Sequence, residues 1–159
     1  MGVLGPLYSK SETRGIYKTM NGGQTWIKTL DLPDPTGIIE LSVVPNDFNI
    51  MYAAAWEKER KAWDFSASGA KSGIYKSTDA GNSWTLISTK ESGFLQGKGV
   101  GRIGLASFDA KTIYAIVDNQ DRRPQFDLSY NKLKKQDFEG ISLEAFMAID
   151  KKLIKNFLY

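Results

Sequence analysis

The chain contains no cysteine and no histidine among its 159 residues. It therefore forms no disulfide bonds and offers no thiolate or imidazole ligands to a metal. The same absences exclude Ser-His-Asp and Cys-His catalysis, in which a histidine acts as the base. Hydrolytic chemistry would have to rest on carboxylates, tyrosine or lysine. The sequence predicts no metal site and no cofactor, and it singles out no catalytic residue.

Long apolar runs are also missing. No stretch approaches the roughly 18 apolar residues that a membrane-spanning helix needs, so no membrane span is predicted. Residues 1–10 lack a basic region followed by an apolar one, so no signal peptide is predicted. The net charge of +3 is small and the basic residues are scattered, which argues against a nucleic-acid partner. The chain begins inside strand-like sequence, which suggests an internal piece of a longer protein.

One stretch of the sequence occurs twice. Residues 14–30 read RGIYKTMNGGQTWIKTL, and residues 72–88 read SGIYKSTDAGNSWTLIS. Tyr17 recurs as Tyr75 and Trp26 recurs as Trp84 at the same spacing, which indicates a structural repeat. In each copy, GIYK alternates apolar and polar residues as a strand does, and a polar turn with glycine follows. Each copy is therefore predicted to form a β-hairpin.

The turns of these hairpins carry a recognisable pattern. Residues 77–84 (STDAGNSW) match the Asp-box, or bacterial neuraminidase repeat, S-x-D-x-G-x-x-W. Residues 19–26 (TMNGGQTW) resemble it, with Thr for Ser and Asn for Asp. The resemblance implies a hairpin between the third and fourth strands of a β-propeller blade, and a turn-capping rather than catalytic role for Asp79. The implied structural residues are Thr19, Asn21, Gly23, Trp26, Ser77, Asp79, Gly81 and Trp84.

A pair of strand-like segments recurs as well. Residues 37–44 and 49–55 read as inner strands, and residues 101–107 and 112–117 correspond to them. Four strands in a period of about 60 residues are typical of a propeller blade. The predicted fold class is mainly β: a partial β-propeller over residues 1–120, with about two four-stranded antiparallel blades. The repeat units are placed around 14–57 and 72–119, and a short helical segment follows.

Two blades cannot close a ring, because propellers need about four to eight. The chain is thus expected to be a fragment whose first partners are the remaining blades of a full-length propeller. The alternatives are a piece that associates with copies of itself and a truncated product that folds poorly.

Residues 121–159 differ in character from the rest. Residues 118–127 are polar and charged, and the apolar residues after Leu133 follow a helical period. We predict a charged linker and then an amphipathic helical tail or insertion, as one helix or two short ones, with Ser142 and Asp150 as N-caps. Its apolar side is expected to pack on the propeller rim or on further sequence, and a partner-binding helix is the alternative. That side consists of Leu143, Phe146, Met147, Leu153, Ile154, Phe157 and Leu158.

Several segments together are similar to bacterial sortilin-type, Asp-box propeller proteins that are often labelled glycosyl hydrolases. These segments are GPLYSKSETRGIYKT, YAAAWEKERKAWDF, SGIYKSTDAGNSW, GRIGLA and YAIVDNQDRRP. The resemblance implies a large multi-blade protein that is secreted or located in the periplasm or cell envelope. It implies no defined chemistry, because most members have no defined activity.

The loop 56–71 is predicted to be the main binding surface. Trp56 and Trp63 offer aromatic faces to a sugar or a peptide, and Glu57, Arg60 and Asp64 offer charged hydrogen bonds. The alternative is that the tryptophans only pack the loop onto a blade. A second set of charged residues lies at the end of the equivalent strand in the next repeat. These residues are predicted to face the same surface, and the alternative is that they form a solvated loop. This set is Asp118, Asp121, Arg122 and Arg123.

A glycosidase needs two carboxylates about 5 to 10 Å apart. Glu57, Asp64, Asp118 and Asp121 are the only reasonable pool, and their spacing selects no pair. The sialidase arginine triad has no match in the chain. We therefore expect a non-catalytic propeller segment of a larger exported protein that binds a peptide, a protein or a glycan. The alternative is a fragment of a carbohydrate-active glycoside hydrolase whose catalytic residues lie mostly outside this chain.

Overall fold

The computed structural model describes residues 1–121 and 133–158 of the chain. It divides into two compact units, Met1–Arg122 and Arg123–Tyr159, and each is described by itself. The first unit consists of antiparallel sheets and the second is helical, so the expected mainly β class with a short C-terminal helical segment is confirmed.

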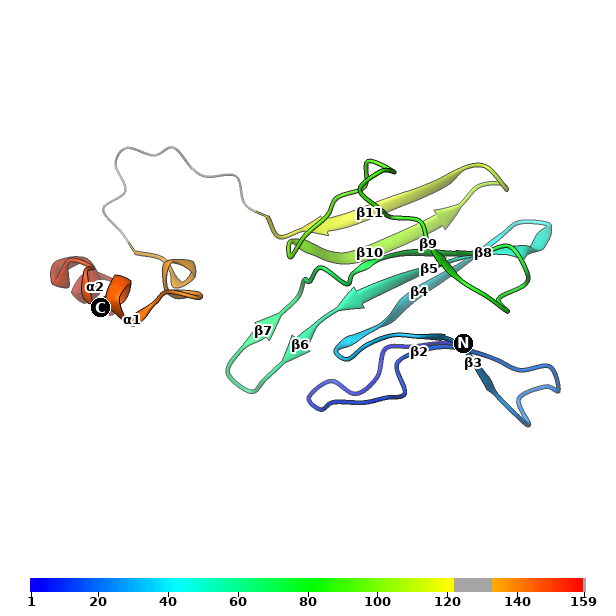
Figure 1. Ribbon diagram of the computed structural model, residues 1–159, viewed down its shortest axis with the longest axis horizontal. Coiled ribbons are helices and arrows are strands. Elements are labelled where there is room, and N and C mark those ends of the chain that lie inside the picture. The colour runs from blue at the N-terminus through cyan, green and yellow to red at the C-terminus, as the bar shows by residue number, and fades with distance from the viewer. Residues whose placement is uncertain (122–132, 159) are drawn as a thin grey trace. The chain divides into compact units, whose positions relative to one another are not determined.

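The first unit is built around one four-stranded antiparallel sheet. Its strands are β4 (Thr36–Val44), β5 (Asp47–Glu57), β8 (Gly73–Ser77) and β9 (Thr85–Leu86), in the order β4-β5-β8-β9 (Figure 1). The predicted inner strands 37–44 and 49–55 correspond to β4 and β5. The second repeat hairpin supplies the outer pair, β8 and β9.

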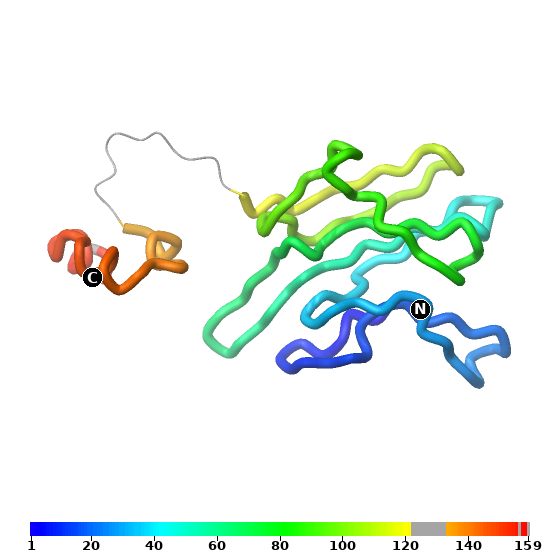
Figure 2. Tube along the Cα trace, in the orientation of Figure 1, coloured from blue at the N-terminus to red at the C-terminus, as the bar shows by residue number. Residues whose placement is uncertain are grey.

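Two smaller sheets flank the four-stranded one, and the chain passes through them in succession (Figure 2). β1 (Gly2–Val3), β2 (Gly15–Lys18) and β3 (Ile27–Asp31) form the first. β10 (Val100–Ser107) and β11 (Ile113–Asn119) form the last. The expectation of about two four-stranded sheets is therefore wrong, because residues 1–121 contain one four-stranded sheet and smaller ones. Each sequence repeat joins the hairpin of one sheet to the inner strands of the next, so the repeat is out of phase with the sheets.

Alternate residues of β5 contribute to two separate cores, because successive side chains of a strand point to opposite faces. Ala53 and Ala55 belong to the core shared with the first sheet, which also contains Ile16. Tyr52 and Ala54 belong to the core shared with β10. The alanines are fully buried, and their small size lets the sheets approach closely.

Polar contacts also join neighbouring sheets. Ser42 on β4 and Ser107 on β10 share a hydrogen bond of 2.8 Å, and Ser42 Oγ also accepts from the Ser107 amide at 3.1 Å. On the other side, the Trp84 indole donates to the Thr29 hydroxyl of β3 at 3.2 Å. The three sheets are thus held together by both apolar and polar contacts.

The expected loop 56–71 is more ordered than its polarity indicated. β5 continues through Glu57, so Trp56 and Glu57 belong to a strand. Beyond it, β6 (Glu59–Arg60) and β7 (Phe65–Ser66) pair as a short hairpin. Backbone hydrogen bonds between Lys61 and Asp64 close its turn. Two-residue strands without apolar alternation carry too weak a pattern to be found in sequence.

The second unit contains a 3₁₀ helix, Lys135–Phe138, followed by α1 (Leu143–Met147) and α2 (Lys151–Leu158). The tail therefore forms two short α-helices. Ser142 caps α1 by accepting from the Ala145 amide at 3.1 Å, and Asp150 accepts from the Lys152 amide at 2.8 Å at the start of α2. The Phe138 ring lies 6.1 Å from that of Phe146 and 4.9 Å from that of Phe157. In residues 1–121 and 133–158, no helix has the length and apolar character needed to cross a membrane.

Candidate functional site

The turn of the second repeat hairpin is organised by two side chains. The Ser77 hydroxyl accepts from the Gly81 amide at 2.8 Å and donates to Asp79 Oδ1 at 2.7 Å. Asp79 Oδ1 also accepts from the amides of Asn82 at 3.0 Å and Ser83 at 2.9 Å. The Ser83 hydroxyl donates to Asp79 Oδ2 at 2.6 Å. These bonds, led by those from Ser83, hold the pKa of the Asp79 carboxyl far below its usual value of 3.8.

The first repeat hairpin has the same arrangement with uncharged residues. The Thr19 hydroxyl accepts from the Gly23 amide at 2.9 Å and donates to Asn21 Oδ1 at 3.0 Å. Asn21 Oδ1 accepts from the Thr25 amide at 2.9 Å. In both copies the polar side chains satisfy backbone groups of their own turn.

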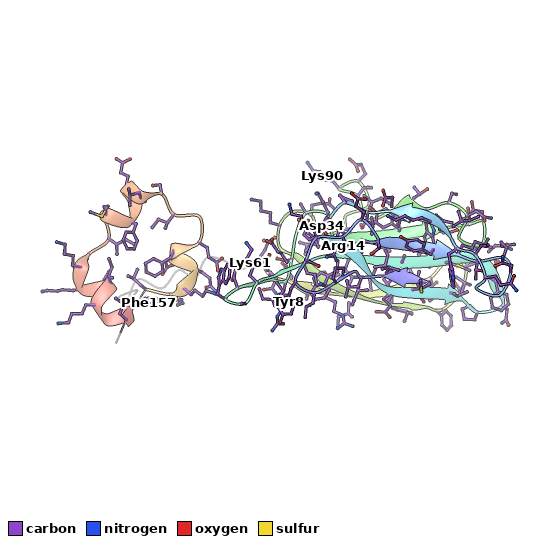
Figure 3. The ribbon with its side chains drawn as sticks, turned by 90° about the horizontal axis from the view of Figure 1, so that it is seen from below. Tyr8, Arg14, Asp34, Lys61, Lys90 and Phe157 are labelled. Carbon is purple, nitrogen blue, oxygen red and sulfur yellow. The ribbon has the colours of Figure 1, made fainter. Side chains whose placement is uncertain are left out.

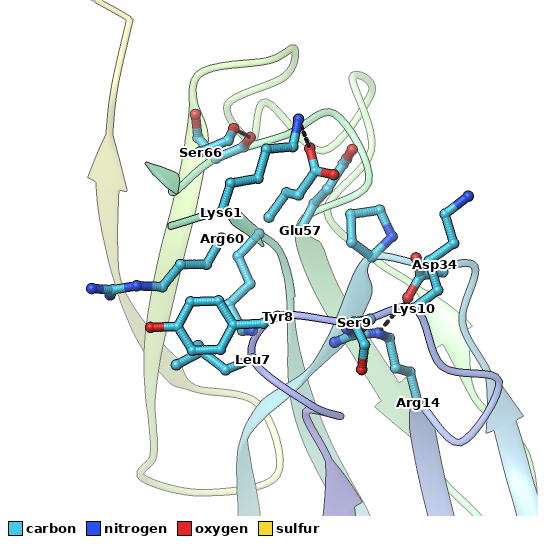
Figure 4. A pocket seen from close by; sticks show the side chains of 14 residues that line it. Leu7, Tyr8, Ser9, Lys10, Arg14, Asp34, Glu57, Arg60, Lys61 and Ser66 are labelled. Atoms are coloured by element: carbon cyan, nitrogen blue, oxygen red, sulfur yellow. Dashed lines mark hydrogen bonds and ion pairs between the residues drawn. The ribbon is translucent and has the colours of Figure 1, made fainter. Parts of the chain in front are cut away.

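A cleft of about 600 Å³ lies at one end of the strands, where three connections meet. Figure 3 shows Tyr8, Arg14, Asp34 and Lys61 at this end of the first unit. The cleft is lined by residues 7–10, 34–35 and 57–61, and by Arg14, Ser66 and Ser68 (Figure 4). Five of the lining side chains are cationic and three are anionic, so the cleft has an excess of positive charge.

Arg14 ties the walls of the cleft together. Its side chain is only 2% exposed, and its Nε donates to Asp34 Oδ1 at 2.8 Å. Its remaining groups donate to the carbonyls of Leu4, of Pro6 at 3.1 Å and of Ser9 at 3.3 Å. Burial opposes ionisation of Asp34, but the bonds from Arg14 and from the Ser11 amide lower its pKa on balance. The guanidinium is therefore used to fix the loop after β1 against the connection before β4.

Lys58 lies just beyond the end of β5 and is only 3% exposed. Its pKa is lowered from the usual 10.5, mainly by burial and further by repulsion from Arg14, while attraction from Asp34 acts in the opposite direction. Within residues 1–121 and 133–158, no hydrogen bond or ion pair engages its ammonium group. An unpaired buried cation is unfavourable for folding, because the charge loses water without gaining a partner.

The rim of the cleft carries aromatic and cationic side chains. The Arg60 guanidinium lies over the Tyr8 ring at 6.0 Å (Figure 4). It also lies over the Phe65 ring at 5.2 Å. Trp63, in the turn of the β6–β7 hairpin and outside the lining of the cleft, is 81% exposed. Lys61 pairs with Glu59 at 3.5 Å. Exposed aromatic faces beside cations are well suited to contact a ligand that has both apolar and polar parts.

The predicted loop residues divide between support and exposure. The Trp56 indole donates to the Ala67 carbonyl at 2.7 Å, and its ring meets that of Phe65 edge-on. Trp56 therefore packs against its own loop, which is the alternative role considered for the two tryptophans. Glu57 accepts from the Lys71 amide at 2.8 Å while lining the cleft. Arg60 lines the cleft, and Trp63 and Asp64 lie in the hairpin turn.

Asp118, at the end of β11, lies away from the cleft. It lines a separate hollow of about 420 Å³ together with Glu40, Arg102 and Ile116. The structure therefore does not bring Asp118 together with Glu57 and Arg60. Arg122 and Arg123 fall outside the described residues.

Sequence reasoning missed Tyr8, Arg14, Asp34 and Lys58. Tyr8 and Asp34 lie in separate connections, and only folding brings them to one cleft. Lys58 belongs to the charged run EKERK, which gives no sign that one lysine is buried. Arg14 stands at the repeat position that Ser72 occupies in the second copy. This replacement of a small polar residue by a charged one was the only sequence signal that could have drawn attention to Arg14.

Comparison with known proteins identifies no relative. A scan against protein-family models, a search of curated proteins and a search of solved structures each found no match to the chain. Among residues 1–121 and 133–158, the acidic side chains form no group of three or more that would hold a metal ion.

Proposed function

We propose that the chain is a non-catalytic segment of a larger, exported Asp-box β-propeller protein, and that it binds a peptide, a protein or a glycan. The order β4-β5-β8-β9 supports this, because sequential strands running across a sheet with a hairpin as the outer pair are typical of a blade. The flanking sheets, with three and two strands, have the connectivity of neighbouring blades that are incomplete.

The open face of the last sheet also supports a larger assembly. Ile116 on β11 is 78% exposed, and Tyr114 on the same strand is exposed as well. On the four-stranded sheet, the corresponding faces are covered by neighbouring sheets. A further blade packed against β10 and β11 would bury these side chains and satisfy the free edge of β11.

The observation that carries the binding role is the cleft with its exposed rim. It combines walls fixed by Arg14 with Tyr8 and Arg60 in its lining, and the β6–β7 hairpin, whose strands supply part of that lining, exposes Trp63 at its turn. Connections between strands often carry binding residues, because a rigid sheet positions them while their own sequence is free to vary.

The glycoside hydrolase alternative gains no support from the carboxylates of this cleft. A general acid needs a raised pKa, whereas the pKa of Asp34 is lowered. Glu57 accepts a backbone hydrogen bond and Glu59 pairs with Lys61. Each of the three lining carboxylates is thus held by a neighbouring group of the chain.

Immobilised glycan and peptide arrays test the binding role. We expect the purified chain to bind a defined class of ligands, and Trp63→Ala to weaken that binding about tenfold, as loss of an aromatic anchor does. Trp26→Ala removes an exposed tryptophan from a repeat hairpin and serves as the matched control. Absence of binding on both arrays, or equal binding by the two variants, would contradict the proposal.

A further inference from the structure

We propose that the cleft is a subsite for an oxyanion, a sulfate, phosphate or carboxylate group of the ligand, and that the Lys58 ammonium is its principal contact. This inference deepens the binding role proposed above and builds on it. It rests on one feature of the first unit: a buried cation that has no hydrogen-bond or ion-pair partner among the described residues and lines a cleft.

Three of the other four cations of the cleft are already engaged, and the fourth, Lys10, acts on the Asp34 carboxylate. Arg14 donates to Asp34 and to three backbone carbonyls, which uses nearly all of its donors. Lys61 pairs with Glu59, and Arg60 lies against the Tyr8 and Phe65 rings. Asp34 neutralises Arg14, so the charge of Lys58 remains without a counterion among the described residues.

The Lys58 ammonium retains access to the cleft. In the described part of the chain, the Thr36 hydroxyl is the only side-chain polar atom that is sealed from water and lacks a hydrogen bond. The Lys58 ammonium also lacks a partner, so it must still reach water, and the cleft is the space that this residue lines. An anion that enters the cleft would thus meet an ammonium on a largely buried side chain, with three donors to offer.

The energetics favour an anionic occupant over a neutral one. A charge-assisted hydrogen bond in a partly dry site is about twice as strong as a neutral one. The Lys58 side chain is already largely buried by folding, so binding has less of its surface left to desolvate. Arg14 repels and Asp34 attracts the Lys58 ammonium, and these two are paired with each other, so the charge that attracts an anion is that of Lys58 itself.

Lysine side-chain NMR with inorganic anions is the direct test. The wild-type chain is titrated with sulfate, phosphate and acetate at constant ionic strength, with chloride as the balancing ion. We expect saturable shifts of the Lys58 signals, while exposed Lys111 in the β10–β11 turn shows none. Bound anion should also raise the pKa of Lys58, because it favours the charged form. The order of affinities distinguishes a tetrahedral from a planar oxyanion.

A variant separates binding from stability. Lys58→Met keeps the apolar stem and removes the charge, so we expect at least about tenfold weaker sulfate binding by calorimetry, together with unchanged or higher resistance to urea. Lys111→Met is the matched control and should retain binding. If Lys58 responds to salt like Lys111, or if Lys58→Met binds sulfate as the wild type does, the oxyanion subsite is wrong.

The outcome of this test is separable from that of the arrays. Binding of array ligands with no effect of Lys58→Met would leave the binding role in place and remove the oxyanion subsite. Saturable sulfate binding at Lys58 with no array ligand would support the oxyanion subsite and contradict the binding role tested on the arrays. The wild-type NMR titration decides the question even if Lys58→Met fails to fold.

Discussion

The two repeat hairpins have the same turn but different surroundings. In each, a hydroxyl at the first position of the pattern accepts from the glycine amide four residues later, at 2.9 Å for Thr19 and 2.8 Å for Ser77. In each, the side chain of the third position accepts from the amide four residues beyond it, at 2.9 Å for both Asn21 and Asp79. Exchange of amide for carboxylate and of threonine for serine leaves this network intact.

The tryptophans of the two hairpins behave differently. Trp84 donates to Thr29 of the preceding sheet and packs against the core that contains Ile16. Trp26 donates to the Gly23 carbonyl of its own turn at 3.1 Å and is 45% exposed. The described chain has no sheet before β1, β2 and β3 for Trp26 to contact. The turn is therefore a local structure, and the role of its tryptophan depends on a neighbouring sheet.

The largest expected difference between the copies concerns these tryptophans. Trp84→Ala should lower the free energy of unfolding by about 2 to 3 kcal/mol, because it removes contacts between two sheets. Trp26→Ala should cost less than about 1 kcal/mol, since an exposed ring gains little from folding. Urea unfolding followed by far-UV circular dichroism measures both. Equal losses would mean that the tryptophan stabilises its own hairpin only.

The next difference concerns the charge of Asp79. Its folded-state pKa is depressed below 3.8, so the stability it contributes is present above about pH 4 and is lost as the pH falls through the folded value. Asp79→Asn converts the second turn to the chemistry of the first and removes this titration. We expect the variant to unfold at lower urea than the wild type at pH 7.

The difference in stability between Asp79→Asn and the wild type should become smaller as the pH is lowered from 5 to 2. The midpoints of urea unfolding of both proteins across that range measure it. The comparison of the two proteins is needed because the pKa values of Asp34 and Asp109 are lowered too, and they titrate in both. Asn21→Ala, which removes an uncharged cap, supplies the control and should change the pH profile little. A difference that stays constant with pH would show that the Asp79 charge does not support the turn.

The smallest expected difference is a backbone effect. Ala80 has a φ of 56°, and Gly22 occupies the equivalent position with a φ of 66°. Alanine is strained in this left-handed region and glycine is not, so Ala80→Gly should stabilise the chain by about 0.5 to 1 kcal/mol, offset in part by unfolded-state entropy. Gly22→Ala should destabilise it by a similar amount, because a Cβ there meets no other atom and only the backbone strain changes. Thermal unfolding of both variants checks the opposite signs.

The strands and hairpins were predictable because their signals are local. Alternation over residues 15–18 and 73–77 matches β2 and β8, and the inner strands were found within a few residues of their bounds. The Ser142 and Asp150 caps were found for the same reason, since each serves the turn that follows it. The division into sheets was not predictable from the repeat, because a strand's partner depends on contacts distant in sequence.

The sequence by itself determined the two turns, the alternation of β5 that serves two cores, and the absence of histidine and cysteine chemistry. These properties depend on residues close together in the chain or on composition alone. Only the tertiary structure decided that Trp84 joins two sheets while Trp26 does not, and that Lys58 is the buried lysine of a charged run. Burial and the choice of partner are set by elements that are distant in sequence. The cleft between residues 7–10, 34–35 and 57–61 exists only once the sheets have packed.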